Sequence, residues 1–280
     1  MNLKDTINHG QKVLKNNNIR SSKLDSEILL SEVIKKDRKY IILNLEKKIN
    51  DEHLKKFKDL INLRSRGKPV AYITGKKNFW KNEFIVTEGV LIPRPDTELI
   101  IEQVIKITKQ KSKLKILDIG VGSGCILLSI LKEKKDFYGI GIDLSKKCID
   151  LSKINASNLE LTNRVKFFKS NVDNFFYGKY DLIISNPPYI KKLDLKYLDK
   201  DVISYEPNLA LDGGLEGISE IRKVIDRSSD LLKRNGKLIL EIAFDQKEKV
   251  TKLLKKRRFY INNILKDFAK NDRCIISTKI

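Results

Sequence analysis

Residues 185–190, SNPPYI, place an amide side chain directly before two prolines and an aromatic residue directly after them. Each proline lacks a backbone N–H and has a fixed φ, so the stretch predicts a stiff, extended elbow. The side-chain oxygen of Asn186 and the carbonyl of Pro187 can then accept two hydrogen bonds from one planar –NH2 group. Such a nitrogen is a poor nucleophile, because its lone pair is delocalised, and fixed acceptors would orient it toward an electrophilic methyl group. We predict catalytic roles for Asn186, Pro187 and Tyr189, and substrate contacts for these three together with Pro188; the alternative is a plain strand-ending turn.

A glycine-rich turn, Gly120-Val121-Gly122-Ser123-Gly124, follows the short, largely apolar run KILDI. Glycine is needed where the backbone turns sharply from a strand into a helix or touches a ligand. The pattern G-x-G-x-G differs from the dinucleotide pattern G-x-G-x-x-G/A and is the form found in class I S-adenosylmethionine (SAM) methyltransferases. The sulfonium of SAM carries the electrophilic methyl group that the elbow requires. We predict that all five residues bind SAM, with S-adenosylhomocysteine as the product and no metal; the alternative is a turn that binds nothing.

Two more candidate cofactor contacts follow the next strands of the predicted sheet. Asp143 ends the run FYGIGID, where a carboxylate can accept hydrogen bonds from both ribose hydroxyls. It could instead cap the following helix, although Ser145 is better placed for that role. Asn171 and Val172 follow the third strand and are predicted to contact the adenine, but Asn171 could equally form an Asx-turn. Asn186 is also predicted to contact the cofactor.

The composition of the chain limits the classes of protein to consider. Its 280 residues are 41% hydrophobic and can therefore bury a substantial core. Three cysteines without a C-x-x-C pair, with only two histidines, argue against a zinc site. No leader-like or membrane-spanning run is visible, and we expect a soluble, cytoplasmic protein. The net charge of +21 comes from lysines spread through every segment, so we expect no specific nucleic-acid contact and no membrane partner.

The elements that position these residues form an α/β domain, which follows a small helical domain along the chain. Residues 1–67 predict helices with apolar stripes, and residues 68–92 predict a β-hairpin linker. From residue 93 to 280, strands and helices alternate, which predicts a doubly wound, Rossmann-like sheet. In that part Asp96 or Thr97 can cap the helix ELIIEQVIKIT, and a later helix is expected to end at Gly236.

With these motifs the sequence resembles the HemK/PrmC family of protein-(glutamine-N5) methyltransferases. The resemblance covers nearly the whole chain and rests on RSRGKPVAYITG, LIPRPDTE, ILDIGVGSGCI, GIDLS, DLIISNPPYI, YEPNLALDGGLEG and GKLILEIAFDQ. It implies a class I SAM-dependent methyltransferase that modifies the glutamine in the Gly-Gly-Gln motif of peptide chain release factors. It also implies that the helical domain helps to dock the release factor.

Two departures from the family pattern concern sites near the cofactor. Many members carry Asp and an aromatic residue where this chain has Asn171 and Val172. Many also have a small residue or His and then Gly where this chain has Ile242 and Ala243. Three other functions remain open at this point. They are glutamine methylation of a ribosomal protein, adenine-N6 methylation of nucleic acid, and RNA binding by a vestigial methyltransferase fold.

Overall fold

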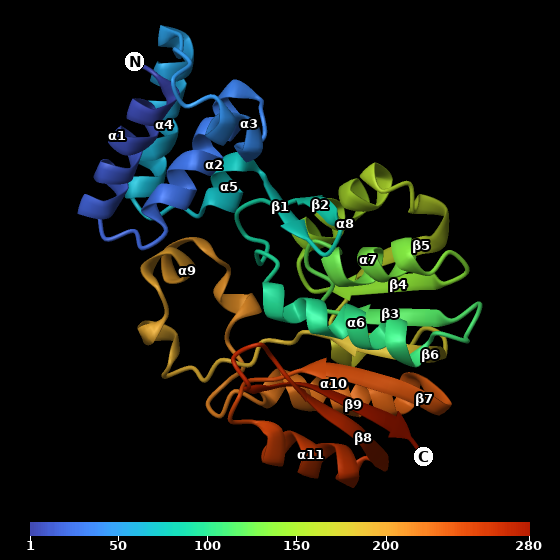
Figure 1. The fold of residues 1–280 in the computed structure, drawn as a ribbon. Helices are drawn as coiled ribbons and strands as arrows, with labels where there is room; N and C mark the ends of the chain where they lie inside the picture. Colours follow the sequence, from blue (N-terminus) through green and yellow to red (C-terminus); the bar gives the residue numbers. More distant parts are fainter. The chain divides into compact units, whose positions relative to one another are not determined.

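The computed structural model describes residues 1–280, and the chain forms two compact units (Figure 1). One unit comprises Met1–Lys76 with Asp199–Tyr205, and the other comprises Lys77–Leu198 with Glu206–Ile280. The helical unit therefore extends beyond residue 67 and includes a short segment from the second half of the chain. None of the helices is both long enough and apolar enough to span a membrane.

The first unit is helical and has an apolar core of its own. Its helices are α1 (Leu3–Asn16), α2 (Ser22–Ile34), α3 (Arg38–Leu43), α4 (Asp51–Ser65), α5 (Val70–Thr74) and α9 (Lys200–Tyr205). Leu29, Leu30 and Phe57 are fully buried in this core. Beside it, Arg64 and Asp25 form a buried ion pair with Nε and Oδ2 2.7 Å apart.

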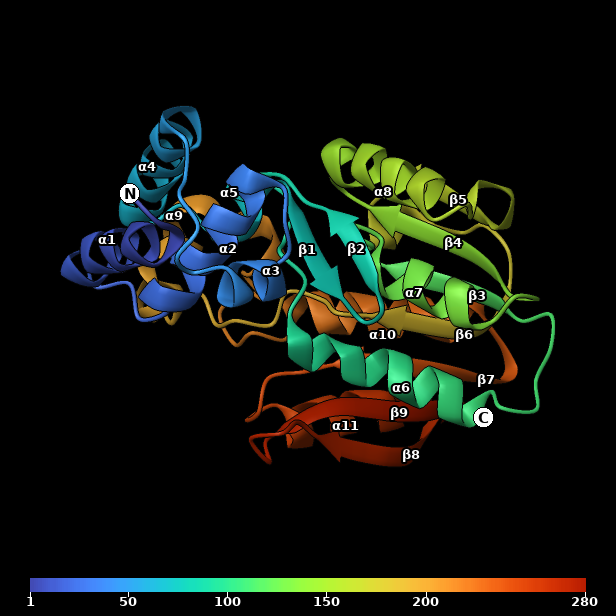
Figure 2. The same cartoon turned by 45° about the horizontal axis from the view of Figure 1, so that its top comes forward.

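The segment that we expected to be a hairpin is partly helical. Residues 70–74 form α5, which ends at Gly75 in the left-handed region with a φ of 74°. Only the following residues form the hairpin, with strands β1 (Lys76–Phe79) and β2 (Asn82–Ile85). Figure 2 shows this hairpin beside α8 (Lys146–Asn158), and Asn155 of α8 bonds to both backbone groups of Ile85.

The second unit is built on a seven-stranded sheet with the order β5-β4-β3-β6-β7-β9-β8. Its strands are β3 (Lys115–Ile119), β4 (Tyr138–Asp143), β5 (Val165–Lys169), β6 (Tyr180–Ser185), β7 (Leu232–Glu241), β8 (Phe259–Lys266) and β9 (Asp272–Lys279). Its helices are α6 (Glu98–Ile107), α7 (Cys125–Glu133), α8 (Lys146–Asn158), α10 (Ser219–Leu231) and α11 (Lys247–Lys256). The first five strands of this order are parallel, and β9 pairs antiparallel with both β7 and β8.

Both faces of the central strands β3, β4 and β6 are buried, which explains their nearly continuous apolar runs. Ile116 and Leu182 pack in the core formed with α6, α7 and α8, whereas Leu117 and Ile183 pack in the core formed with α10 and α11. Figure 2 shows these two groups of helices on opposite faces of the sheet. The predicted doubly wound α/β architecture is confirmed.

The expected end of a later helix was also wrong. The helix predicted to reach Gly236 ends at Leu231, because Leu232 already pairs with Tyr180 of β6. The register then shifts, and regular pairing resumes between Leu182 and Lys237. A long-range strand pairing therefore overrides a local helix-stop signal.

Candidate functional site

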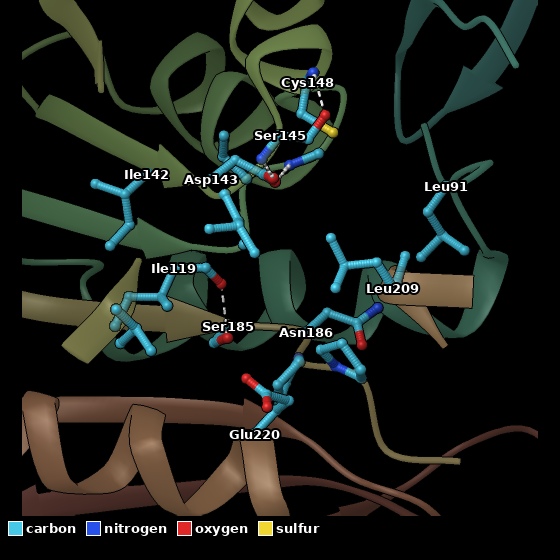
Figure 3. Close-up of a pocket in the computed structure, with 18 of the residues that line it drawn as sticks. Leu91, Ile119, Ile142, Asp143, Ser145, Cys148, Ser185, Asn186, Leu209 and Glu220 are labelled. Carbon is cyan, nitrogen blue, oxygen red and sulfur yellow. Dashed lines mark hydrogen bonds between the residues drawn. The ribbon is translucent and has the colours of Figure 1, made fainter. Parts of the chain in front are cut away.

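A cavity of about 430 Å³ opens at the carboxyl ends of β3, β4 and β6 in the second unit (Figure 3). The residues that line it lie within the segments 89–97, 119–126, 142–148, 170–172, 185–188, 207–212 and 220–224. Doubly wound sheets bind ligands in this crevice, where parallel strands end at the same edge. The parallel register aligns these ends: Ile119 of β3 pairs with Ile142 of β4 and with Ser185 of β6.

The glycine turn forms one wall of the cavity. Gly120 and Gly122 adopt φ values of 79° and 57°, and a Cβ atom built on either would meet no atom within 4 Å. Their missing side chains therefore leave open space in which a ligand can approach the backbone. Gly124 differs, because it does not line the cavity and its Cβ would come within 2.9 Å of Leu128 Cδ1. A side chain at this position would crowd Leu128 of helix α7, and the predicted SAM contact of Gly124 stays a prediction.

Asp143 lies at the cavity end of β4 and holds the glycine turn in place. Its Oδ2 accepts a hydrogen bond from Gly122 N at 3.0 Å, and its Oδ1 accepts one from Ser145 N at 2.8 Å. Each oxygen keeps a further lone pair for a ligand. Burial raises the pKa of this carboxyl above its ordinary value. Ser145 is the N-cap of α8, as expected, with its Oγ accepting from Cys148 N at 3.4 Å.

Asn171 and Val172 line the cavity at the end of β5, and Val172 supplies an apolar wall. The Oδ1 of Asn171 accepts a hydrogen bond from Asp173 N at 3.1 Å. This is the Asx-turn that the sequence analysis kept as the alternative. The turn occupies part of the acceptor capacity that the adenine contact would use, and that contact stays a prediction.

The proline elbow begins where β6 ends, as the sequence predicted. Ser185 Oγ donates a hydrogen bond to Ile119 O at 2.7 Å and so joins the ends of two central strands. Asn186, Pro187 and Pro188 line the cavity. Asn186 Nδ2 donates to Thr97 Oγ1 at 3.2 Å, which leaves the Oδ1 of this amide as its free acceptor.

Tyr189 does not line the cavity. Its hydroxyl donates to Glu241 Oε1 at 3.2 Å, and its carbonyl oxygen accepts from Gln246 Nε2 at 2.9 Å. Gln246 Nε2 also donates to Gly217 O at 2.8 Å, so one buried amide joins the elbow to the loop before α10. The predicted substrate contact of Tyr189 stays a prediction, and its hydroxyl is bonded to Glu241 at the end of β7.

Unpartnered polar groups lie around the glycine turn. The Oγ of Ser123 is buried and without a hydrogen-bond partner, and so are both carboxyl oxygens of Asp118. Burial raises the pKa of Asp118 to about 8, and the negative charge of Asp143 adds to this rise. Buried polar groups without a partner call for an explanation, and one explanation is that a bound ligand supplies the missing hydrogen bonds.

The donor set around the cavity fits SAM. The backbone is open to a ligand at Gly120 and Gly122, the Asp143 carboxylate has lone pairs left for hydroxyl groups, and Val172 forms an apolar wall. These features suit the ribose and the uncharged adenine ring of SAM. The two cysteines in the wall, Cys125 and Cys148, are neutral thiols, because burial raises the pKa of each to about 12. They are therefore not thiolate nucleophiles.

Two site features escaped the sequence analysis. Thr97, expected as a possible helix cap, makes no capping hydrogen bond and instead accepts one from Asn186. Arg94 lines the cavity and pairs with the buried Glu206, whose Oε2 also accepts from Ile92 N at 3.3 Å. These residues lie in IPRPDTE and YEPN, two stretches that carry the family resemblance, but no local pattern in either indicates which side chains pair.

Comparisons with known proteins cover nearly the whole chain. The family described as PrmC N-terminal domain matches residues 5–75, and the family described as methyltransferase small domain matches residues 95–215. A release factor glutamine methyltransferase of Clostridium acetobutylicum is 39% identical, over 100% of this chain and 99% of the relative. One from Buchnera aphidicola (subsp. Acyrthosiphon pisum) is 37% identical over the same shares. A bifunctional methyltransferase of Rickettsia conorii is 34% identical, over 94% of this chain and 55% of its own length.

Solved structures share the fold at low sequence identity. A methyltransferase from Pyrococcus furiosus superposes with a TM-score of 0.53 at 16% identity, over 70% of this chain and 88% of its own. A ribosomal protein L11 methylase from Lactobacillus delbrueckii subsp. bulgaricus gives a TM-score of 0.52 at 17% identity, over 73% of this chain and 90% of its own. At these identities the similarity concerns the methyltransferase fold alone.

Proposed function

This chain belongs to the family of release factor glutamine methyltransferases, which use SAM as methyl donor, and we propose that it methylates the glutamine of the Gly-Gly-Gln motif in peptide chain release factors. The methyl group goes to the side-chain amide nitrogen, N5. The release factor is accordingly the proposed protein partner, and the helical unit is the proposed docking domain.

The observation that carries the proposal is the amide of Asn186 at the cavity wall. Its Nδ2 is held by Thr97 at 3.2 Å, so its Oδ1 is left to accept a hydrogen bond from another group. The Asn186 oxygen and the Pro187 carbonyl accept one hydrogen bond each from the –NH2 of the substrate glutamine. Both acceptors belong to a proline-stiffened segment, so they are arranged before the substrate arrives.

On this proposal the site residues form two groups, one that binds SAM and one that orients the substrate. Gly120, Gly122 and Asp143 bind the adenosine part of SAM, and Asn186 with Pro187 orients the glutamine nitrogen. When bound, SAM supplies an electrophilic methyl group and leaves as S-adenosylhomocysteine. The acceptors at the elbow direct the nitrogen lone pair toward that methyl group, and the nitrogen releases one proton to solvent as its new bond to carbon forms.

The test is methyl transfer from labelled SAM to a purified release factor. A release factor in which the glutamine of Gly-Gly-Gln is replaced by alanine serves as the matched control. We expect label on the first protein and none on the second. Ribosomal protein and nucleic acid are offered in parallel reactions, and label on one of these but not on the release factor would overturn the proposed substrate.

A further inference from the structure

Thr97 is placed to control which way the Asn186 amide faces. Its side chain is 3% exposed, lines the cavity and accepts a hydrogen bond from Asn186 Nδ2. A hydroxyl has one hydrogen to donate and two lone pairs. Because one lone pair already accepts from Asn186, the Thr97 hydrogen has to point toward a different acceptor.

A buried carboxyl, Glu241, lies near Thr97. Asp96, the chain neighbour of Thr97, pairs with Arg273 (Oδ2 to Nη2, 3.8 Å), and Cys274 next to Arg273 lies opposite Glu241 in the β7–β9 pairing. Glu241 ends strand β7, is 1% exposed and accepts from the Tyr189 hydroxyl through Oε1. Its Oε2 is buried and has no hydrogen-bond partner. Burial raises the pKa of Glu241 to about 7, and the Thr97 hydroxyl is close enough to oppose that rise.

We propose that Glu241 is a positioning residue that acts through Thr97: the ionised Oε2 takes the Thr97 hydrogen, Thr97 accepts from Asn186 Nδ2, and Asn186 Oδ1 is thereby held toward the substrate nitrogen. The inference rests on the proposed function, because it assigns a purpose to the oxygen that the proposed substrate needs. An amide turned by 180° would present two donors to the –NH2 of the glutamine, and the hydrogen bond would be lost.

Protonation of Glu241 reverses the donor and acceptor roles in the hydrogen bonds that link Glu241, Thr97 and Asn186. A protonated Oε2 donates to Thr97, whose own hydrogen is then free to bond Asn186 Oδ1 and turn the amide. The rate of methyl transfer should therefore fall as Glu241 gains a proton. The ionisable groups that face this carboxyl are Tyr189 on the elbow, Asp96 beside Thr97, and Arg273 and Cys274 on β9. Arg94 in the preceding loop faces Tyr189, and Asp267 is paired to Arg273.

Two variants of Thr97 separate the hydroxyl from the volume of the side chain. Thr97→Val keeps the shape and removes the acceptor, whereas Thr97→Ser keeps the hydroxyl. We expect Thr97→Val to lower kcat about 10- to 100-fold with little change in the Kd for SAM, as for loss of one preorganised contact. Thr97→Ser should stay within about threefold of the unaltered protein, since it preserves the same hydrogen bond. Equal rates for the two variants would overturn the inference.

Glu241→Gln tests the charge without removing the side chain. The unaltered protein should lose activity below about pH 7, with a single-proton dependence, and the variant should lack this limb. If both proteins lose activity in the same way below about pH 7, Glu241 is not the group whose protonation lowers the rate.

A spectroscopic measurement keeps this test separate from the choice of substrate. The side-chain amide signals of Asn186, assigned with Asn186→Ser, should shift with a midpoint near pH 7 in the unaltered protein and stay constant in Glu241→Gln. If the release factor is not methylated but the signals titrate in this way, the proposed substrate fails and the positioning chain stands. If the release factor is methylated and the signals do not titrate, the positioning chain fails and the proposed function stands.

Discussion

Replacing Asp118 by asparagine should make the protein more stable at alkaline pH. The carboxyl is fully buried beneath the glycine turn, and neither of its oxygens has a hydrogen-bond partner. Burial raises its pKa from 3.8 to about 8, helped by the charge of Asp143. The folded protein therefore keeps a proton that the unfolded chain releases near pH 4. Above about pH 4 the Asp118 carboxyl must either take up a proton on folding or be buried as a charged group.

The sign and the size of the effect follow from the difference in bound protons. Because the folded state binds more protons between pH 4 and pH 8, the stability of the unaltered protein falls as pH rises through this window. Each pH unit inside the window corresponds to at most about 1.4 kcal/mol. Between pH 5 and pH 8 the stability of Asp118→Asn relative to the unaltered protein should thus increase by about 2–4 kcal/mol, the lower figure allowing for partial hydration.

The measurement is urea unfolding of both proteins at pH 5 and pH 8, with the free energy of unfolding compared at each pH. Ser129→Ala is a matched control, because the Ser129 hydroxyl is also buried without a partner but does not titrate. That control should change stability by the same amount at both pH values. A pH-independent difference for Asp118→Asn as well would show that this carboxyl is not protonated in the folded protein, and would refute the reasoning.

Three further predictions concern the site and its support. Asn186→Ala should slow methyl transfer by about 10²-fold with SAM affinity roughly intact, and normal turnover would contradict the role of the amide. Asp143→Ala should weaken SAM binding by about 1–3 kcal/mol in calorimetry, because it leaves both Gly122 N and the ligand without their acceptor; an unchanged affinity would rule out the ribose contact. Asn155→Ala should lower the free energy of unfolding by about 1–3 kcal/mol, since its buried amide ties Ser123 O to the backbone of β2. The exposed Asn158 on the same helix is the control, and equal effects of the two alanine variants would show that the bonds of Asn155 contribute little.

The sequence by itself determined that three of the segments lining the cavity meet at one edge of the sheet. Asp143, the glycine turn and the proline elbow each follow an apolar run, and parallel strands bring their carboxyl ends to one edge of the sheet. The order of strands and helices in the second unit was therefore readable from local patterns. The signals that begin and end such elements lie within a few residues of each boundary.

The tertiary structure alone decided how the site residues are held. Thr97 has the sequence context of a helix cap, yet its hydroxyl bonds Asn186, 89 residues away. Tyr189 follows the prolines as an aromatic expected at the substrate, yet its hydroxyl bonds Glu241, 52 residues away. Local patterns report propensity and burial, whereas these partners are chosen by which side chains the packed sheet brings together. The same physics explains why α10 ends at Leu231, where pairing of β7 with β6 replaces helical hydrogen bonds.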